Sequence, residues 1–99
     1  MHRSKLESYG EILGAIVKKP LTVDSIAYET NMDCTILKQH LDFLIKSNLV
    51  EEQNASRKTL YAATERGVAV FKALNFQKYL EMVIDIVGMT DETLQTVPT

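Results

Sequence analysis

The sequence predicts a mainly α-helical domain with one small β-hairpin, an α+β fold in a chain of 99 residues. Two short helical patterns lie on either side of Asn31-Met32-Asp33, a stretch typical of a tight turn. Two strand patterns with polar residues between them follow at 49–62. From Glu65 onward the chain has the apolar spacing of one long helix. Together these observations predict a three-helix body, a hairpin and a long final helix.

The first helix is expected over residues 5–17. Ser4 and Glu7 have the spacing of a capping box, in which each side chain binds the backbone N–H of the other residue. Pro20 follows the helix, and proline disfavours helical geometry in the residue before it. The apolar residues of this segment recur at helical spacing: Leu6, Tyr9, Ile12, Leu13, Ile16 and Val17.

A second, shorter helix is expected to begin at Thr22 or Asp24 and to end near Thr30. Both residue types accept hydrogen bonds from the first backbone N–H groups of a helix. Just before it, Leu21 is predicted to form a strand of one or two residues. The residues predicted to face the core are Val23, Ile26 and Ala27, with Tyr28 as a further candidate.

The third helix, over residues 34–47, carries the predicted binding surface. Asp33 suits its N-cap, and Asn48 suits a left-handed residue after its last turn. Phe43 and Ile45 are expected to pack on the hairpin or on the last helix, and the alternative is that they form part of the dimer contact with the last helix. An apolar stripe turns toward the core: Leu37, Leu41 and Leu44. The helical repeat turns the opposite side toward solvent, and that side carries Thr35, Lys38, Gln39 and Asp42.

A β-hairpin is expected directly after the third helix. Residues 49–53 and 59–62 form the predicted strands, and the polar stretch 54–58 forms the turn between them. The second and third helices, joined by the turn at 31–33, have the layout of a helix-turn-helix. A hairpin that follows the second helix of such a motif is typical of the wing in a winged helix-turn-helix. We therefore expect a wing at about 50–62.

The last helix is expected over residues 65–87, ending at Gly88. It would be longer than a three-helix body can cover, since a helix rises about 1.5 Å per residue. A helix that is apolar on several sides must be buried on several sides, so we expect a homodimer. A seam of alternating four- and three-residue steps runs along it: Ala69, Ala73, Phe76, Leu80, Val83 and Val87. The last four of these residues are the predicted dimer interface.

The exposed side of the third helix suits contact with double-stranded DNA. Gln39 can pair with an adenine edge, Lys38 can bind guanine or a phosphate, and Thr35 can bind a phosphate or a thymine methyl group. Asp42 argues against DNA binding at this face, because phosphates repel its carboxylate, unless it accepts a hydrogen bond from a cytosine amino group. The alternative interpretation is the solvated face of an ordinary amphipathic helix.

Three further residues are candidates for DNA contact. Arg57 and Lys58 lie at the predicted tip of the hairpin, which can reach the minor groove or flanking phosphates. His40 either packs against the body or contacts a phosphate. Cys34 follows the N-cap of the third helix, where the helix dipole favours a thiolate, so a redox-responsive sensor is a further possibility.

Composition narrows the class of protein. Hydrophobic residues make up 45% of the chain and charged residues 24%, as in folded soluble proteins. A single cysteine suits the cytoplasm, and no apolar run approaches the roughly 18 residues needed to cross a bilayer. The net charge of −2 argues against a strongly electrostatic DNA binder. However, four acidic residues and no basic residues follow Tyr79, so the chain up to Tyr79 has 11 basic and 9 acidic residues. The acidity therefore lies away from the predicted DNA-binding face. No phosphate-binding glycine loop, catalytic triad or zinc-ligand spacing occurs, so we expect no enzyme activity, cofactor or metal site.

A set of residues between Ser4 and Val87 carries a family resemblance: Leu21-Thr22-Val23, Ile26-Ala27, Leu37, His40-Leu41, Leu44, Asn48-Leu49-Val50, Tyr61 and Thr64-Glu65-Arg66-Gly67. The pattern resembles the winged-helix transcriptional regulators of archaea, above all the small type whose long C-terminal helix dimerises as an antiparallel coiled coil. The multiple-antibiotic-resistance and arsenic-repressor regulators share the core pattern. The resemblance implies that a dimer binds double-stranded DNA, with the third helix in the major groove. Asn48 stands where a glycine is usual, and asparagine also adopts the left-handed conformation.

The sequence is compatible with two functions. The first is a sequence-specific, double-stranded-DNA-binding transcriptional regulator that acts as a homodimer, with recognition helix 34–47 in the major groove and wing 50–62 on flanking DNA. The second is a protein–protein interaction module in a larger assembly, without base readout. The predicted segments are a winged helix-turn-helix domain (1–64), a dimerisation helix (65–88) and a disordered tail (89–99).

Overall fold

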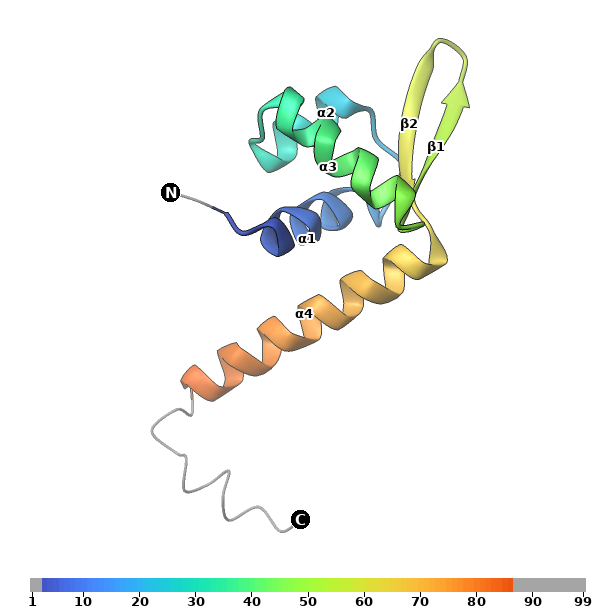
Figure 1. Cartoon of the computed structure of the whole chain (residues 1–99). Coiled ribbons are helices and arrows are strands. Elements are labelled where there is room, and N and C mark those ends of the chain that lie inside the picture. The colour runs from blue at the N-terminus through green and yellow to red at the C-terminus, as the bar shows by residue number, and fades with distance from the viewer. Residues whose placement is uncertain (1–2, 87–99) are drawn as a thin grey trace.

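The computed structural model describes residues 3–86, which form four helices and a two-stranded antiparallel sheet. In chain order the elements are α1 (Lys5–Ile16), α2 (Val23–Thr30), α3 (Cys34–Lys46), β1 (Val50–Ala55), β2 (Lys58–Ala63) and α4 (Glu65–Ile86). Helices α1 to α3 form the body, the β1–β2 hairpin stands beside α3, and α4 runs past α1 and continues beyond it (Figure 1). The mainly helical α+β class is therefore confirmed. The predicted helix end at Val87 and Gly88 and the predicted tail lie outside the described residues.

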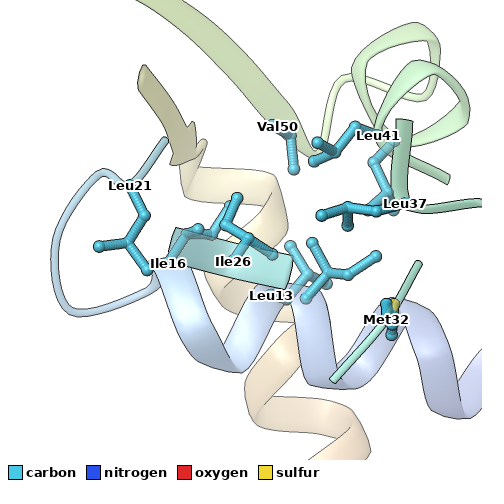
Figure 2. Close-up of a cluster of buried hydrophobic side chains, with 10 residues drawn as sticks. Leu13, Ile16, Leu21, Ile26, Met32, Leu37, Leu41 and Val50 are labelled. Atoms are coloured by element: carbon cyan, nitrogen blue, oxygen red, sulfur yellow. The ribbon is translucent and has the colours of Figure 1, made fainter. Parts of the chain in front are cut away.

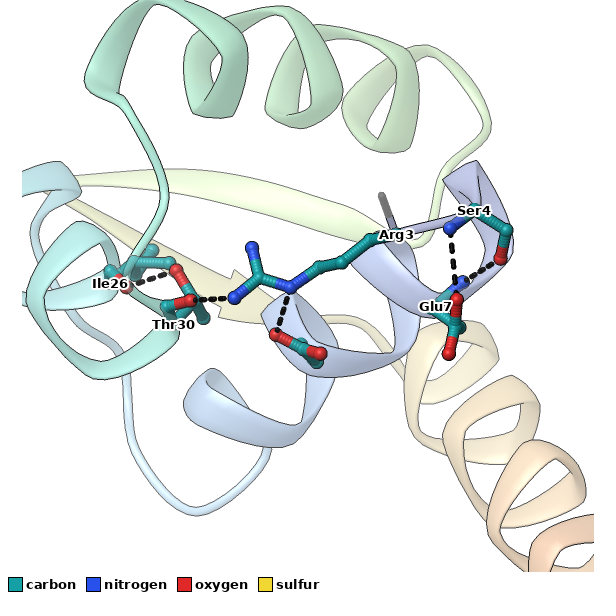
Figure 3. A network of polar contacts seen from close by, with 6 residues as sticks. Arg3, Ser4, Glu7, Ile26 and Thr30 are labelled. Atoms are coloured by element: carbon teal, nitrogen blue, oxygen red, sulfur yellow. Dashed lines mark hydrogen bonds and ion pairs between the residues drawn. The ribbon is translucent and has the colours of Figure 1, made fainter. Parts of the chain in front are cut away.

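The first two helices begin as the local sequence dictates. Glu7 N donates to Ser4 Oγ at 3.0 Å and Ser4 N donates to Glu7 Oε1 at 2.9 Å, which confirms the capping box (Figure 3). Thr22, rather than Asp24, is the N-cap of α2, because its Oγ1 accepts a hydrogen bond from Ser25 N at 3.2 Å. Helix α1 ends at Ile16, one residue before the expected end.

The connections around α3 also follow the sequence. The Asp33 carboxylate accepts hydrogen bonds from two backbone N–H groups and caps α3, as predicted. Asn31 (φ 57°) ends α2 and Asn48 (φ 64°) follows α3, both in the left-handed conformation. Leu21 forms a single β-bridge with Tyr61 through hydrogen bonds of 3.1 and 2.7 Å, which confirms the one-residue strand.

The core lies where α1, α2, α3 and the base of the hairpin meet (Figure 2). Fully buried side chains come from all four elements: Ile12, Leu13, Ile16, Ile26, Leu37, Leu41, Leu44 and Val50. The predicted leucine stripe of α3 is thereby confirmed. The inward placement of Tyr28 is wrong, since this side chain is 88% exposed. The short helix α2 has one buried face, and Ile26 and Thr30 occupy it.

The hairpin is longer than the sequence suggested. Its strands pair in antiparallel register along their whole length, so that only Ser56 and Arg57 form the turn. Ser56 has φ 57°, the left-handed conformation that two-residue hairpin turns require. The predicted turn at 54–58 is therefore too long. Backbone pairing does not depend on apolar side chains, and Asn54 pairs with Thr59, whose Oγ1 donates to Asn54 Oδ1 at 3.4 Å.

Helix α4 is docked on the body through its first half. Thr64 Oγ1 accepts a hydrogen bond from Gly67 N at 3.0 Å, and Gly67 lies directly against the carbonyl group of Leu49. Farther along, Phe71 and Leu74 lie beside two glycines of α1. No helix in the described part of the chain is long and apolar enough to cross a membrane.

Candidate nucleic-acid interface

Helix α3 is anchored on one face and open on the other. Its three stripe leucines are buried in the core, whereas Thr35, Lys38 and Gln39 are all exposed. The Asp33 cap fixes the first turn of the helix, so the exposed face is held at a defined position above the body. Three of the six predicted DNA contacts therefore share one surface, which we call the α3 face (Thr35, Lys38 and Gln39).

Asp42 lies next to the α3 face, and its charge is balanced. Its Oδ2 lies 3.1 Å from Nζ of Lys46, one helical turn later. Both side chains are well exposed, so the pair contributes little to stability. The pair is nevertheless neutral as a unit, which leaves Lys38 as the net charge of this side of the helix. Asp42 is thus a weaker obstacle to an anionic ligand than its position in the sequence suggests.

The wing, which is the β1–β2 hairpin, carries the next two candidates. Arg57 lies in the turn, Lys58 is the first residue of β2, and both are exposed. Figure 1 shows the wing projecting beside α3. Lys58 of the wing and Lys38 of the α3 face line the same hollow. The neighbouring strand β1 carries two exposed acids, Glu51 and Glu52.

His40 is the one predicted contact that is not exposed. Its half-buried ring meets the ring of Tyr9 edge-on, with centroids 5.2 Å apart. Phe43 stacks on the same tyrosine with ring centroids 4.9 Å apart, so the aromatic partner that the structure gives it lies in α1 rather than in the hairpin or the last helix. Ile45, by contrast, lines a small hollow between α3 and the wing. No sequence pattern identifies Tyr9 of α1 as a support for α3, because only the fold brings these rings together.

The profile of the family described as winged helix-turn-helix matches residues 2–83. The chain belongs to this family. A comparison with curated protein sequences gives no match.

Several solved structures resemble this winged helix-turn-helix protein in fold. A mutant of Lactococcus lactis ZitR is 25% identical with a TM-score of 0.67, covering 98% of this chain and 71% of that one. The transcriptional regulator BldR from Sulfolobus solfataricus is 20% identical with a TM-score of 0.70, covering 88% and 66%. Sso10a-2, a DNA-binding protein from Sulfolobus solfataricus, is 14% identical with a TM-score of 0.70, covering 98% and 99%.

Polar interactions of Tyr61 and Arg3 connect elements of the domain. Burial raises the pKa of Tyr61 above its ordinary value, and the negative charge of Glu52 and a hydrogen bond to it raise it further. Tyr61 therefore remains a neutral donor beside the base of the wing. Arg3 connects α1 to α2, because its guanidinium donates to the Thr30 carbonyl at 2.7 Å and pairs with Glu11 at 3.2 Å (Figure 3). No local pattern predicts this contact, since Arg3 and Thr30 are distant along the chain.

The two described residues of the predicted dimer interface are left uncovered by the body. Phe76 is 61% exposed and Leu80 is 43% exposed. The two alanines that precede them on the same seam are not buried. The side chain of Val83 and the residue Val87 lie outside what the structure describes.

Proposed function

We propose that this winged helix-turn-helix protein is a sequence-specific transcriptional regulator of the archaeal winged-helix type that binds double-stranded DNA as a homodimer. The observation that carries the proposal is the α3 face, which is polar, basic and exposed on a helix whose opposite face is fixed by three buried leucines. Helices of this kind enter the major groove and contact base edges. A cytoplasmic location is part of the same proposal, because the DNA lies there.

Each residue then takes a role that its chemistry permits. Gln39 pairs with an adenine edge, and Thr35 contacts a thymine methyl group or a phosphate. Arg57, in the turn of the wing, reaches the minor groove or a flanking phosphate. Of the two roles open to His40, packing is the better supported, because its ring is turned toward Tyr9.

A homodimer through α4 is supported by the exposure of its apolar seam. Phe76 and Leu80 are large, apolar and exposed, whereas the other side of the helix packs Val70 and Phe71 against the body. Exposed apolar side chains that follow one another along a helix favour a protein partner. Two copies related by a two-fold axis would present their α3 faces to half-sites about 34–36 Å apart, one turn of DNA.

The fold comparisons are consistent with this proposal. Sso10a-2 is described as a DNA-binding protein, and nearly all of both chains is covered by the match. BldR is described as a transcriptional regulator. Both likenesses are at low identity, so the assignment to DNA rests on the α3 face rather than on these proteins.

Selection of bound sequences from a random pool of DNA duplexes tests the proposal. The full-length chain is expected to enrich a palindromic sequence with its half-sites one helical turn apart. Binding should weaken steeply with salt, because phosphate contacts release counterions. Enrichment of no sequence after repeated rounds would contradict the proposed function.

A protein–protein interaction module is the second candidate. The exposed acids Glu51 and Glu52 on the wing favour it, since a wing that lies along phosphates is expected to be free of acids. A gel shift with mixed genomic fragments at low salt separates the two functions. Retardation at micromolar protein supports DNA binding, and its absence supports the interaction module.

A further inference from the structure

A hollow of about 330 Å³ lies between the start of α2, the first turns of α3 and the strand β2 of the wing. It lies directly beside the α3 face, since Lys38 belongs to both. Polar and charged side chains from three elements line it: Thr22, Asp24, Cys34, Lys38, Lys58 and Thr59.

The two lysines of this hollow come from different elements and have no acidic partner. Among the side chains that the structure describes, neither Lys38 nor Lys58 has a carboxylate within 4.0 Å, whereas Arg3 and Lys46 each have one. Two cations that face the same hollow repel each other unless an anion lies between them. Asp24 is the one acid on the wall, so the side chains around the hollow carry a net positive charge.

A second hollow beside Lys38 does not share the net positive charge of the first hollow. It measures about 230 Å³, shares Lys38 with the first hollow, and is also lined by Asp42 and Glu52. An anion placed there would meet the Glu52 carboxylate and the ammonium group of Lys38, because Asp42 is already paired with Lys46. The side chains around the second hollow therefore carry no net positive charge, whereas those around the first hollow do.

We propose that the first hollow binds one phosphate of the DNA backbone in each half-site, held between Lys38 and Lys58. The inference rests on the proposed function and refines it. It gives Lys38 the phosphate role rather than the guanine role, and it leaves Thr35 and Gln39 to contact the bases. The Thr59 hydroxyl adds a donor, because its contact with Asn54 is long at 3.4 Å and can be exchanged for a phosphate oxygen.

The salt dependence of binding distinguishes this role from base recognition. Lys38→Met and Lys58→Met keep the apolar stem and remove the charge. The Lys38→Met/Lys58→Met variant is expected to reduce the slope of log affinity against log salt by about 0.9 per half-site, because one phosphate contact is lost, and each single variant should reduce it by a part of that amount. The fold loss should be the same on selected and scrambled duplexes. Lys72→Met, which removes an exposed lysine of α4, is the matched control and should change neither quantity. Asp24→Asn should tighten binding to both duplexes by about two- to fivefold at low salt.

Replacement of single phosphates by uncharged methylphosphonates locates the contact and separates backbone phosphate from free phosphate. At one position in each half-site, the substitution should weaken binding of the wild-type protein but have no effect on the Lys38→Met/Lys58→Met variant. The inference is overturned if no position behaves in this way, or if Lys38→Met weakens binding only to the selected sequence. Failure of the proposed function itself is recognised separately, because the wild-type protein would then bind neither duplex.

Discussion

Replacing Gly67 with alanine is expected to destabilise the protein by about 3 kcal/mol. A Cβ atom at this position would lie 2.1 Å from the carbonyl oxygen of Leu49. Because real Cβ contacts essentially never fall below 3.0 Å, α4 and the α3–β1 connection must separate by roughly 1 Å. The obstacle is backbone, so no change of rotamer relieves it. The same carbonyl accepts the hydrogen bond from Thr64 N at 3.0 Å, which the displacement would weaken.

Two glycines of α1 provide graded controls. A Cβ on Gly10 would lie 3.6 Å from Leu74 Cδ1, an ordinary contact, so Gly10→Ala should stabilise the helix by about 0.5–1 kcal/mol. A Cβ on Gly14 would lie 3.0 Å from Cε1 of Phe71. The Phe71 ring can tilt, so the gain in helix propensity and the crowding should nearly cancel for Gly14→Ala.

Urea unfolding followed by circular dichroism measures the series at one fixed protein concentration, because the stability of a dimer depends on concentration. The midpoint should rise for Gly10→Ala, stay near the wild-type value for Gly14→Ala, and fall by about 1–3 M for Gly67→Ala. A Gly67→Ala midpoint equal to that of the wild type would refute the reasoning. It would mean that α4 does not dock against Leu49, and that the α3 face and the α4 seam are not held in one rigid unit.

Three other perturbations test separate parts of the structure. Phe76→Glu with Leu80→Glu should convert the proposed homodimer to a folded monomer in sedimentation equilibrium, because two charges would be buried against an apolar partner. A dimer that persists would exclude this side of α4. The pKa of Tyr61 is raised in the folded protein, so its contribution to stability is present at neutral pH and is lost as pH rises above about 10, through the folded-state pKa. Raising the pH above about 10 should therefore lower the free energy of unfolding more in the wild type than in Tyr61→Phe. Glu52→Gln should move the pKa of Tyr61, measured by absorbance titration, toward its ordinary value. Asp33→Ala should cost about 1 kcal/mol through loss of the α3 cap, seen as a melting temperature about 4–8 °C lower; an unchanged melting temperature would show that the cap is dispensable.

Features that depend on neighbours in the sequence were predictable. The capping box at Ser4 and Glu7, the Asp33 cap and the left-handed Asn48 each need only residues within one helical turn, and the structure has all three. The leucine stripe of α3 follows from helical periodicity alone, so the face that it turns to solvent was predictable too.

Features that depend on contacts between different helices and strands could not be predicted from the sequence. Tyr28 has a large aromatic side chain of the kind often found in a core, but the short helix α2 buries only one face and Tyr28 lies outside it. Phe43 finds its partner in Tyr9 of α1, a pairing that no local pattern specifies. The hollow between Lys38 and Lys58 exists because the wing stands beside α3, and the sequence places these two lysines in separate elements.

The decisive experiment compares dissociation constants on the selected duplex and on a scrambled duplex for the wild type and for the Thr35→Ala/Gln39→Ala variant. A regulator that contacts bases through the α3 face should prefer the selected duplex by about 10³-fold or more. The variant should lose nearly all of that preference, while its affinity for the scrambled duplex and its circular dichroism spectrum stay unchanged. A variant that keeps the wild-type preference would show that the bases are contacted elsewhere on the protein.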